Sequence, residues 1–246
     1  MIDASLFNRL GLTSAVRHEL ALRNSLLPRR WDYEALSPHH EEVAKLLIPG
    51  LRRHVTGRPA SVVLSAKGWR GVRPIHVMTL PDRSLYRAVV DLIAASLPAV
   101  VTQRAPFEIF NKAPLGRGTR YVSKSDVAAY YEFVDHARLA DELIAQTGEE
   151  PAVDLLAGLL GRVMGRRVGL PQVNTASNVL GDTYIDIARR RLARGGYAVF
   201  TYSDDFRIAS KTLADARGAL EACAEEVREL GLVLNERKTF TYGAKK

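Results

Sequence analysis

The sequence predicts an α+β fold, with a helical region at its start and a largely antiparallel sheet backed by helices in its second half. Residues 1–60 have the spacing of helices, and alternating apolar residues flank a polar turn at residues 197–210, which is typical of a β-hairpin. Residues 121–242 follow the order strand, helices, hairpin, helix, strand. This alternation alone also admits other α/β arrangements.

The composition is that of an ordinary globular protein rather than a disordered chain. The 246 residues are 47% hydrophobic and 25% charged, which suits one large domain or two coupled subdomains with a sizeable core. The formal net charge is +8, and a basic balance of this size favours a polyanionic partner such as a nucleic acid. A basic soluble protein without such a partner is the alternative at this point.

The cysteine content and the hydropathy exclude several classes of protein. Cys223 is the single cysteine, so the chain has no internal disulfide and no cysteine-rich zinc site. Residues 1–12 lack the basic segment and the continuous apolar segment of a signal peptide. No stretch reaches the roughly eighteen uninterrupted apolar residues that a membrane span needs. We therefore expect a cytoplasmic protein with no membrane partner.

Residues 1–60 are expected to be mainly helical. Apolar residues recur at helical spacing in two stretches, with Pro28, Pro38 and Pro49 as breaks. Basic residues cluster in this region and predict either a solvated face or a face that contacts phosphates. They are Arg29, Arg30, Arg52, Arg53 and His54.

A basic hairpin is predicted next, with strands at Val62–Leu64 and Ile75–Leu80. The glycine-rich turn between them carries Lys67, Trp69 and Arg70. Cationic groups beside a ring that can stack could lie over a nucleotide triphosphate or a template strand.

The remaining elements alternate between helices and strands. Pro81 and Asp82 open a helix that ends near Pro98, because proline and aspartate favour the first turn of a helix. Residues 104–120 show little periodicity and are expected to form a loop. The later elements are a strand at 121–127, helices from 134 and at 151–163, 176–191 and 212–231, a loop at 169–174, and a strand at 232–243 with Lys238 in its turn.

Aspartates stand at two strand ends in this order of elements. Asp204 and Asp205 lie at the tip of the hairpin, and Asp126 lies where a strand meets an apolar run. Adjacent carboxylates repel each other unless a cation compensates, and Mg²⁺ prefers carboxylate oxygens. Brought together, the three aspartates would hold two Mg²⁺ ions for phosphoryl transfer. An exposed turn, or a helix cap at Asp126, is the alternative from these residues alone.

Five motifs in this order resemble those of reverse transcriptases, especially the bacterial group related to retron, group II intron and phage-defence enzymes. The resemblance covers about residues 60–242, and five ordered motifs are far more specific than one. The segments that carry it are Arg73-Pro74-Ile75 with Asp82-Arg83, Asp126 to Tyr131 with Val134-Asp135-His136, Gly169-Leu170-Pro171-Gln172, Tyr202-Ser203-Asp204-Asp205, and Gly231-Leu232 with Asn235, Lys238 and Thr239.

The resemblance implies a right-hand polymerase architecture of fingers and palm. Residues 1–60 would form a helical N-terminal region, residues 61–120 a fingers-like part, and residues 121–246 a palm-like catalytic part. The palm would be an antiparallel sheet backed by helices. No thumb is recognisable after the palm motifs, so another chain or an oligomer would have to hold the product duplex.

The resemblance also implies a role for each site residue. Asp126 and Asp204 would bind two Mg²⁺ ions, or Mn²⁺, together with the carbonyl of Val127, and Asp205 would support them. Lys238 could protonate the pyrophosphate leaving group, with a surface lysine as the alternative. The residues expected to contact the nucleotide are Arg73, Lys67, Tyr130, Tyr131 and Gln172, and those expected to contact nucleic acid are Arg70, Trp69, Arg83 and Tyr202.

Two of these residues have a more specific implied task. The ring of Tyr131 would exclude a ribose 2′-hydroxyl, and Gln172 would position the template and the incoming base. Val173 departs from the family, in which glycine usually follows the Pro-Gln pair. A β-branched residue is expected to exclude the positive-φ backbone that glycine permits, and so to change the shape of this loop.

Three functions remain open at the level of sequence. The leading one is an RNA-directed DNA polymerase that uses an RNA template and deoxynucleotides to make DNA, with bacterial antiviral defence as its expected role and a mobile-element origin as the alternative. The second is an untemplated or RNA-synthesising nucleotidyltransferase. The third is a catalytically silent subunit that binds nucleic acid. A noncoding RNA or a further protein chain is an additional candidate partner.

Overall fold

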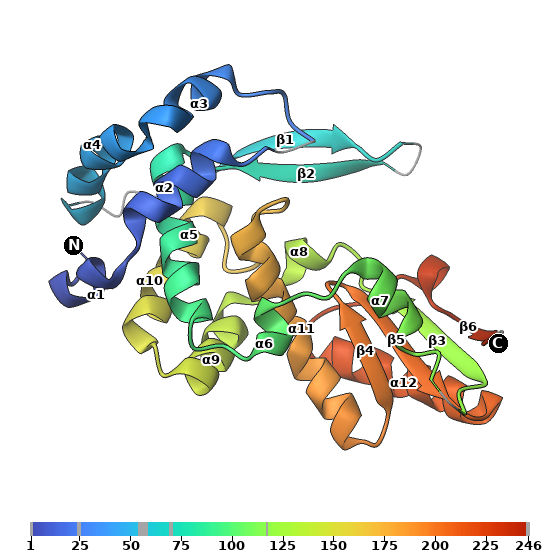
Figure 1. Cartoon of the computed structure of the whole chain (residues 1–246). Coiled ribbons are helices and arrows are strands. Elements are labelled where there is room, and N and C mark those ends of the chain that lie inside the picture. Colours follow the sequence, from blue (N-terminus) through green and yellow to red (C-terminus); the bar gives the residue numbers. More distant parts are fainter. Residues whose placement is uncertain (1, 24–25, 54–58, 69–70, 117, 245–246) are drawn as a thin grey trace. The chain divides into compact units, whose positions relative to one another are not determined.

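The computed structural model describes residues 2–23, 26–53, 59–68, 71–116 and 118–244. The chain divides into two compact units, the first formed by residues 1–97 and 136–177 and the second by residues 98–135 and 178–246. Helices and antiparallel sheets occur together in these units (Figure 1), so the predicted α+β class is confirmed. No helix among the described residues has the length and apolar character to cross a membrane. The three-part division predicted from the sequence stays a prediction.

The first unit is mostly helical. Its helices and hairpin strands are α1 (Ala4–Arg9), α2 (Leu12–Ala21), α3 (Trp31–Leu36), η1 (Ser37–His39), α4 (His40–Arg53), β1 (Ser61–Ala66), β2 (Val72–Val77), α5 (Leu80–Ala94), α9 (His136–Thr147) and α10 (Glu150–Met164). Helix α2 packs against α4 and α5, and α10 packs against α5 and α9. Val16 and Leu20 of α2 are buried in this core.

Two boundaries in the first unit differ from the sequence prediction. Pro49 lies inside α4 and does not end it, at the cost of the one backbone hydrogen bond that a proline cannot donate. The second strand of the hairpin ends at Val77 and not at Leu80, because Thr79 caps the next helix by accepting a hydrogen bond from the backbone N–H of Asp82. Helix α5 therefore begins at Leu80.

The second unit is a four-stranded antiparallel sheet with helices. Its strand order is β4-β5-β3-β6 (Figure 1). The elements are α6 (Ala99–Thr102), α7 (Phe107–Lys112), β3 (Tyr121–Asp126), α8 (Tyr130–Phe133), β4 (Ala198–Tyr202), β5 (Asp205–Ser210), α12 (Leu213–Glu229), η2 (Glu236–Lys238) and β6 (Phe240–Gly243). Helix α11 (Thr175–Arg194) begins in the first unit and continues into this one.

The sheet has one face against α12, which packs on β3 and β5. The hydroxyl of Ser123 on β3 donates to the carbonyl of Ala216 on α12, so alternate β3 residues face this helix. Asp126 follows at an odd number of positions and therefore faces the opposite side. Thr212 and Asp215 form a capping box that starts α12, where the sequence predicts the helix.

Two predictions about the second unit are wrong. The segment expected to be a loop at residues 104–120 contains helix α7, which packs against β4. The strand expected at residues 232–243 is confined to β6, because η2 and its preceding turn interrupt it. Both errors arise where contacts with the sheet, rather than local periodicity, decide the conformation.

Candidate active site

Three aspartates from two separate segments meet at one end of the sheet. In the pairing of β3 with β5, Asp126 lies directly opposite Asp205. Such partners have Cα atoms about 4.5–5.5 Å apart and side chains on the same face. The backbone N–H of Val127 donates to the carbonyl of Asp204 at 3.0 Å. The predicted meeting of distant acidic residues is therefore a feature of this fold.

The tight turn between β4 and β5 places Asp204 at the hairpin tip. Tyr202 pairs with Asp205 across the two strands, so the turn consists of Ser203 and Asp204. Ser203 has a φ of 55°, in the left-handed region that few residues other than glycine adopt. The turn is thus a conformation that surrounding contacts have to hold.

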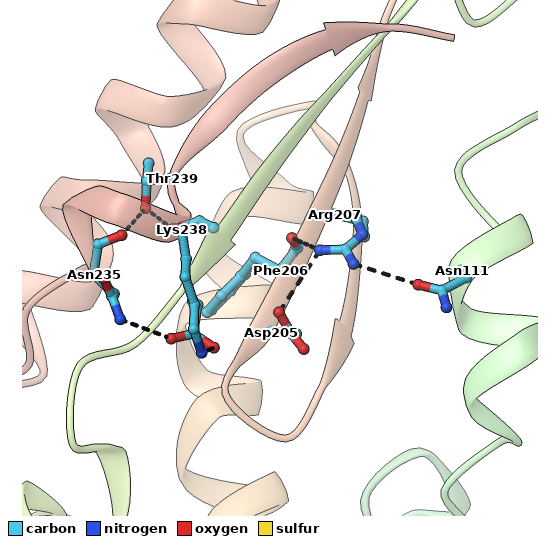
Figure 2. A network of polar contacts seen from close by, with 9 residues as sticks. Asn111, Asp205, Phe206, Arg207, Asn235, Lys238 and Thr239 are labelled. Carbon is cyan, nitrogen blue, oxygen red and sulfur yellow. Dashed lines mark hydrogen bonds and ion pairs between the residues drawn. The ribbon is translucent and has the colours of Figure 1, made fainter. Parts of the chain in front are cut away.

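The carboxylates are partly withdrawn from water and lie close to one another. Burial raises the pKa of Asp204 to about 6, and the charges of Asp126 and Asp205 add to the effect. Burial also raises the pKa of Asp205, while the charge of Arg207 lowers it. Figure 2 shows Arg207 with Asp205 on one side, at 3.7 Å, and Asn111 on the other, at 3.3 Å.

Lys238 contacts this cluster directly. Its Nζ donates to Oδ1 of Asp126 at 2.9 Å, and the Lys238 side chain is 41% exposed. The backbone N–H of Asn235 donates to the carbonyl of Asp126 at 2.7 Å and fixes the turn that carries Lys238. Lys238 is therefore anchored at the carboxylates, although it remains accessible from outside.

The carboxylate oxygens suit a hard divalent cation, but they do not have the geometry of a metal-binding site. Among the described residues, no group of three or more His, Cys, Asp or Glu has the geometry to hold a metal ion. Lys238 holds Asp126 and Arg207 attracts Asp205, whereas no ion pair within the described part of the chain reaches Asp204. The raised pKa of Asp204 marks a local lack of positive charge. Mg²⁺ and Mn²⁺ bind carboxylate oxygens, and here the negative charge of such oxygens is not fully compensated. The residues therefore fit the ions that the sequence predicted.

Two tyrosines follow Asp126 along the chain. The Tyr131 hydroxyl donates to Oδ1 of Asn178 on α11 at 2.9 Å and lies 3.4 Å from the Ser203 hydroxyl. Tyr130 is buried and donates to the carbonyl of Gly181, and its ring meets that of Tyr131 edge to face at 5.3 Å. Tyr130 thus supports the neighbouring ring, and its predicted contact with a nucleotide stays a prediction.

Tyr202 is packed against neighbouring side chains. Its ring centroid lies 5.2 Å from that of Phe107 and 5.4 Å from that of Phe110, and Arg104 lies over it at 5.0 Å. A predicted contact between Tyr202 and nucleic acid stays a prediction. The sequence analysis does not identify Arg104, because this residue lies in the segment that the sequence predicts to be a loop.

The remaining predicted residues belong to the first unit. Arg73 lies on β2 opposite Ser65, and the backbone N–H of Lys67 donates to the carbonyl of Gly71 across the turn. Arg83 forms an ion pair with the fully buried Glu19 at 2.6 Å. Trp69 and Arg70 lie outside the described residues.

Gln172 lines a cavity of about 990 Å³ in the first unit, together with Arg30, Arg83 and Val173. Val173 has a φ of 57°. The expectation that a β-branched residue excludes left-handed backbone at this position is therefore wrong. The loop keeps the backbone conformation that glycine would adopt, and it does so with a side chain that disfavours it.

Comparisons with known proteins give a family and a fold. A family model described as reverse transcriptase (RNA-dependent DNA polymerase) matches residues 66–245. A solved structure of apo telomerase from Candida tropicalis, truncated from the C-terminal domain, is similar with a TM-score of 0.54 at 12% identity. The match covers 84% of this chain and 56% of that one, so the chain spans little more than half of that structure. Likeness at this identity concerns the fold alone. No curated protein matches the sequence.

Proposed function

The chain belongs to the reverse transcriptase family, and from this premise we propose that it is an RNA-directed DNA polymerase that transfers nucleotides with two divalent cations. One observation carries the proposal. Asp126 faces Asp205 across paired strands while Asp204 lies at the adjoining turn, which brings Asp126 together with two adjacent aspartates that are distant from it in the sequence. The family match includes all three positions.

The side chains at this end of the sheet would have separate roles in metal binding and proton transfer. Asp126 and Asp204, with the carbonyl of Val127, would hold two Mg²⁺ or Mn²⁺ ions, and Asp205 would stabilise that arrangement. When bound, the ions would supply positive charge to the attacking and leaving oxygens. Lys238 would release Asp126 and donate a proton to the leaving pyrophosphate, for which its position and exposure are suitable.

Selection and positioning of the substrates would fall to other residues. The ring of Tyr131 would exclude a ribose 2′-hydroxyl, next to the supporting ring of Tyr130. In the first unit, Arg73 and Lys67 would bind the triphosphate, and Gln172 would position template and incoming base from the edge of its cavity. Arg83 and Tyr202, with Trp69 and Arg70, complete the proposed nucleic-acid contacts.

The proposed partners are an RNA template, a DNA product and deoxynucleotides, in the cytoplasm. The formal charge of +8 supports binding to a polyanion. The resemblance to phage-defence enzymes extends the proposal to a role in antiviral defence, in which a noncoding RNA or a second chain would take part.

The test is primer extension on an RNA template with Mg²⁺ or Mn²⁺. Asp204→Ala combined with Asp205→Ala should abolish synthesis, because the cations lose their ligands. Asp141→Asn on α9, an exposed position, serves as a matched control that should retain activity. Circular dichroism establishes that each variant is folded. Synthesis by the folded double variant would refute the assignment.

A catalytically silent nucleic-acid-binding subunit is the second candidate. The observation that favours it is the contact between Lys238 and Asp126, where an ammonium group already compensates one carboxylate. This candidate predicts no gain in melting temperature with Mg²⁺ or Mn²⁺. The polymerase proposal predicts a gain that the Asp204→Ala, Asp205→Ala variant lacks.

A further inference from the structure

A partly buried ion pair lies beside the candidate active site and belongs to none of the motifs. Arg104, between α6 and α7, donates from Nε and Nη2 to the two carboxylate oxygens of Asp182 on α11, at 2.9 Å and 2.7 Å. The two side chains are only 25% and 14% exposed. Two parallel bonds between a guanidinium and a carboxylate fix the relative orientation of both groups.

The pair touches both residues that precede Asp204. The guanidinium carbon of Arg104 lies 5.0 Å from the centre of the Tyr202 ring. Burial raises the pKa of Asp182, while Arg104 and the backbone N–H of Ser203 counteract this by favouring its charged form. The Asp182 carboxylate therefore faces the left-handed turn at Ser203 as well as Arg104.

The same helix also holds the ring of Tyr131. Asn178 lies four residues before Asp182, so the two side chains lie on one face of α11. Asn178 accepts the hydrogen bond from the Tyr131 hydroxyl, which in turn lies near the hydroxyl of Ser203. One helix face thus contacts the hairpin turn on one side and the tyrosine ring on the other.

We propose that the Arg104–Asp182 pair, with Asn178, is a positioning element that holds the Ser203 turn against Tyr131 and thereby sets the preference for deoxynucleotides over ribonucleotides. This role rests on the proposed polymerase function. A ring can exclude one additional hydroxyl only if its distance from the bound sugar is fixed, and a turn with positive φ relaxes when its contacts are lost. The pair acts through Tyr131 and Ser203 and does not itself touch the nucleotide.

The decisive variant is Asp182→Asn, which keeps the shape of the side chain and removes its charge. Asp186→Asn is the matched control, because Asp186 lies one turn further along α11, is buried, and pairs with Arg189 and Arg190 of its own helix. Arg104→Lys is a milder variant that keeps the positive charge and loses the two parallel bonds. It provides a readout if Asp182→Asn does not fold.

The first measurement is kcat/KM for a deoxynucleotide and for the matching ribonucleotide in primer extension. Asp182→Asn should lower the ratio of the two values by about tenfold or more, Arg104→Lys should lower it less, and Asp186→Asn should leave it unchanged. In a Tyr131→Ala background, Asp182→Asn should change the ratio no further. Equal losses for both nucleotides, or an equal effect of Asp186→Asn, would overturn the proposal.

The second measurement does not require catalysis. Hydrogen–deuterium exchange of the peptide that contains Tyr202 to Asp205 should be faster in Asp182→Asn than in the wild type and unchanged in Asp186→Asn. Unchanged exchange in Asp182→Asn would refute the positioning role. A wild-type protein that extends no primer would refute the proposed function itself, before any variant is compared, and that outcome is recognisable from the wild type alone.

Discussion

Replacing Asp204 by asparagine should stabilise the metal-free protein at neutral and alkaline pH. The carboxyl group lies in a half-buried turn beside two other carboxylates, with a pKa raised to about 6 by partial burial and by the charges of Asp126 and Asp205. Asparagine is similar in shape and carries no charge. The variant therefore removes the cost of ionisation and leaves most of the packing in place.

The pKa of Asp204 sets both the size and the pH window of the effect. The folded pKa of about 6 exceeds the ordinary value of 3.8 by about 2, which corresponds to roughly 3 kcal/mol at full ionisation. Well below pH 3.8 the carboxyl is protonated in both the folded and the unfolded protein and does not lower the free energy of unfolding. Between about pH 4 and 6 the unfolded chain ionises first, so the folded wild type loses stability as the pH rises. Above about pH 6 the full cost is present.

The assay is urea unfolding in EDTA at pH 4.5 and at pH 8. The gain in unfolding free energy from Asp204→Asn should be about 1 kcal/mol at pH 4.5 and approach about 3 kcal/mol at pH 8. Asp141→Asn, at an exposed position on α9, controls for the loss of one acidic residue. At pH 8, Mg²⁺ should stabilise the wild type and stabilise Asp204→Asn much less, because the cation removes the same cost.

A variant that is equally or less stable than the wild type at pH 8 would refute the reasoning. So would a gain of the same size at both pH values, because a cost that comes from ionisation must disappear when the group is protonated. Either result would mean that Asp204 is solvated or already compensated in solution, and the argument for a local lack of positive charge would be lost.

Three further predictions concern single positions. Val173→Gly should be about 1 kcal/mol more stable in urea unfolding than Val173→Ala, because only glycine relieves the φ of 57°; the reverse order would show that the loop is not left-handed. Gly181→Ala should lower the melting temperature, because its Cβ would lie 3.2 Å from Cε1 of the immobile Tyr130 ring, whereas Gly218→Ala, which has nothing within 4 Å, should raise it. Burial raises the pKa of the Cys223 thiol to about 12, so iodoacetamide at pH 8 should leave it unmodified in the native protein and alkylate it after denaturation, as mass spectrometry would detect.

The sequence allowed the carboxylate-bearing elements to be predicted because their signals are local. The hairpin at β4 and β5 follows from alternation on either side of a turn, and α12 follows from apolar spacing together with its cap at Thr212. The meeting of Asp126 with the hairpin is not local. It came from the order of family motifs, and the pairing of β3 with β5 supplies its physical basis.

The contacts that hold the site were not predictable by the same means. Helix α7 has six residues, too few for a periodic signal, and Phe107 and Phe110 hold it by packing on the ring of Tyr202. The sequence does not decide between a catalytic and a surface position for Lys238, because the distance from Lys238 to Asp126 depends on how the segment after α12 returns to β3. The hydrogen bond from Asn235 to Asp126 holds this segment where Lys238 contacts Asp126, and a catalytic role for Lys238 stays a proposal.

Helix α11 carries a signal that was present in the sequence but could not be interpreted from it. Asn178, Gly181 and Asp182 have the spacing i, i+3, i+4, which places small or polar residues on one face of the helix. Such a face must meet close backbone or polar partners, since a buried carboxylate without a partner is costly. Only the fold identifies those partners as the two tyrosines, Arg104 and the Ser203 turn. Two features therefore define the site. The acidic residues are recognisable from the local sequence pattern, whereas the role of the α11 face depends on which residues lie opposite it in the fold.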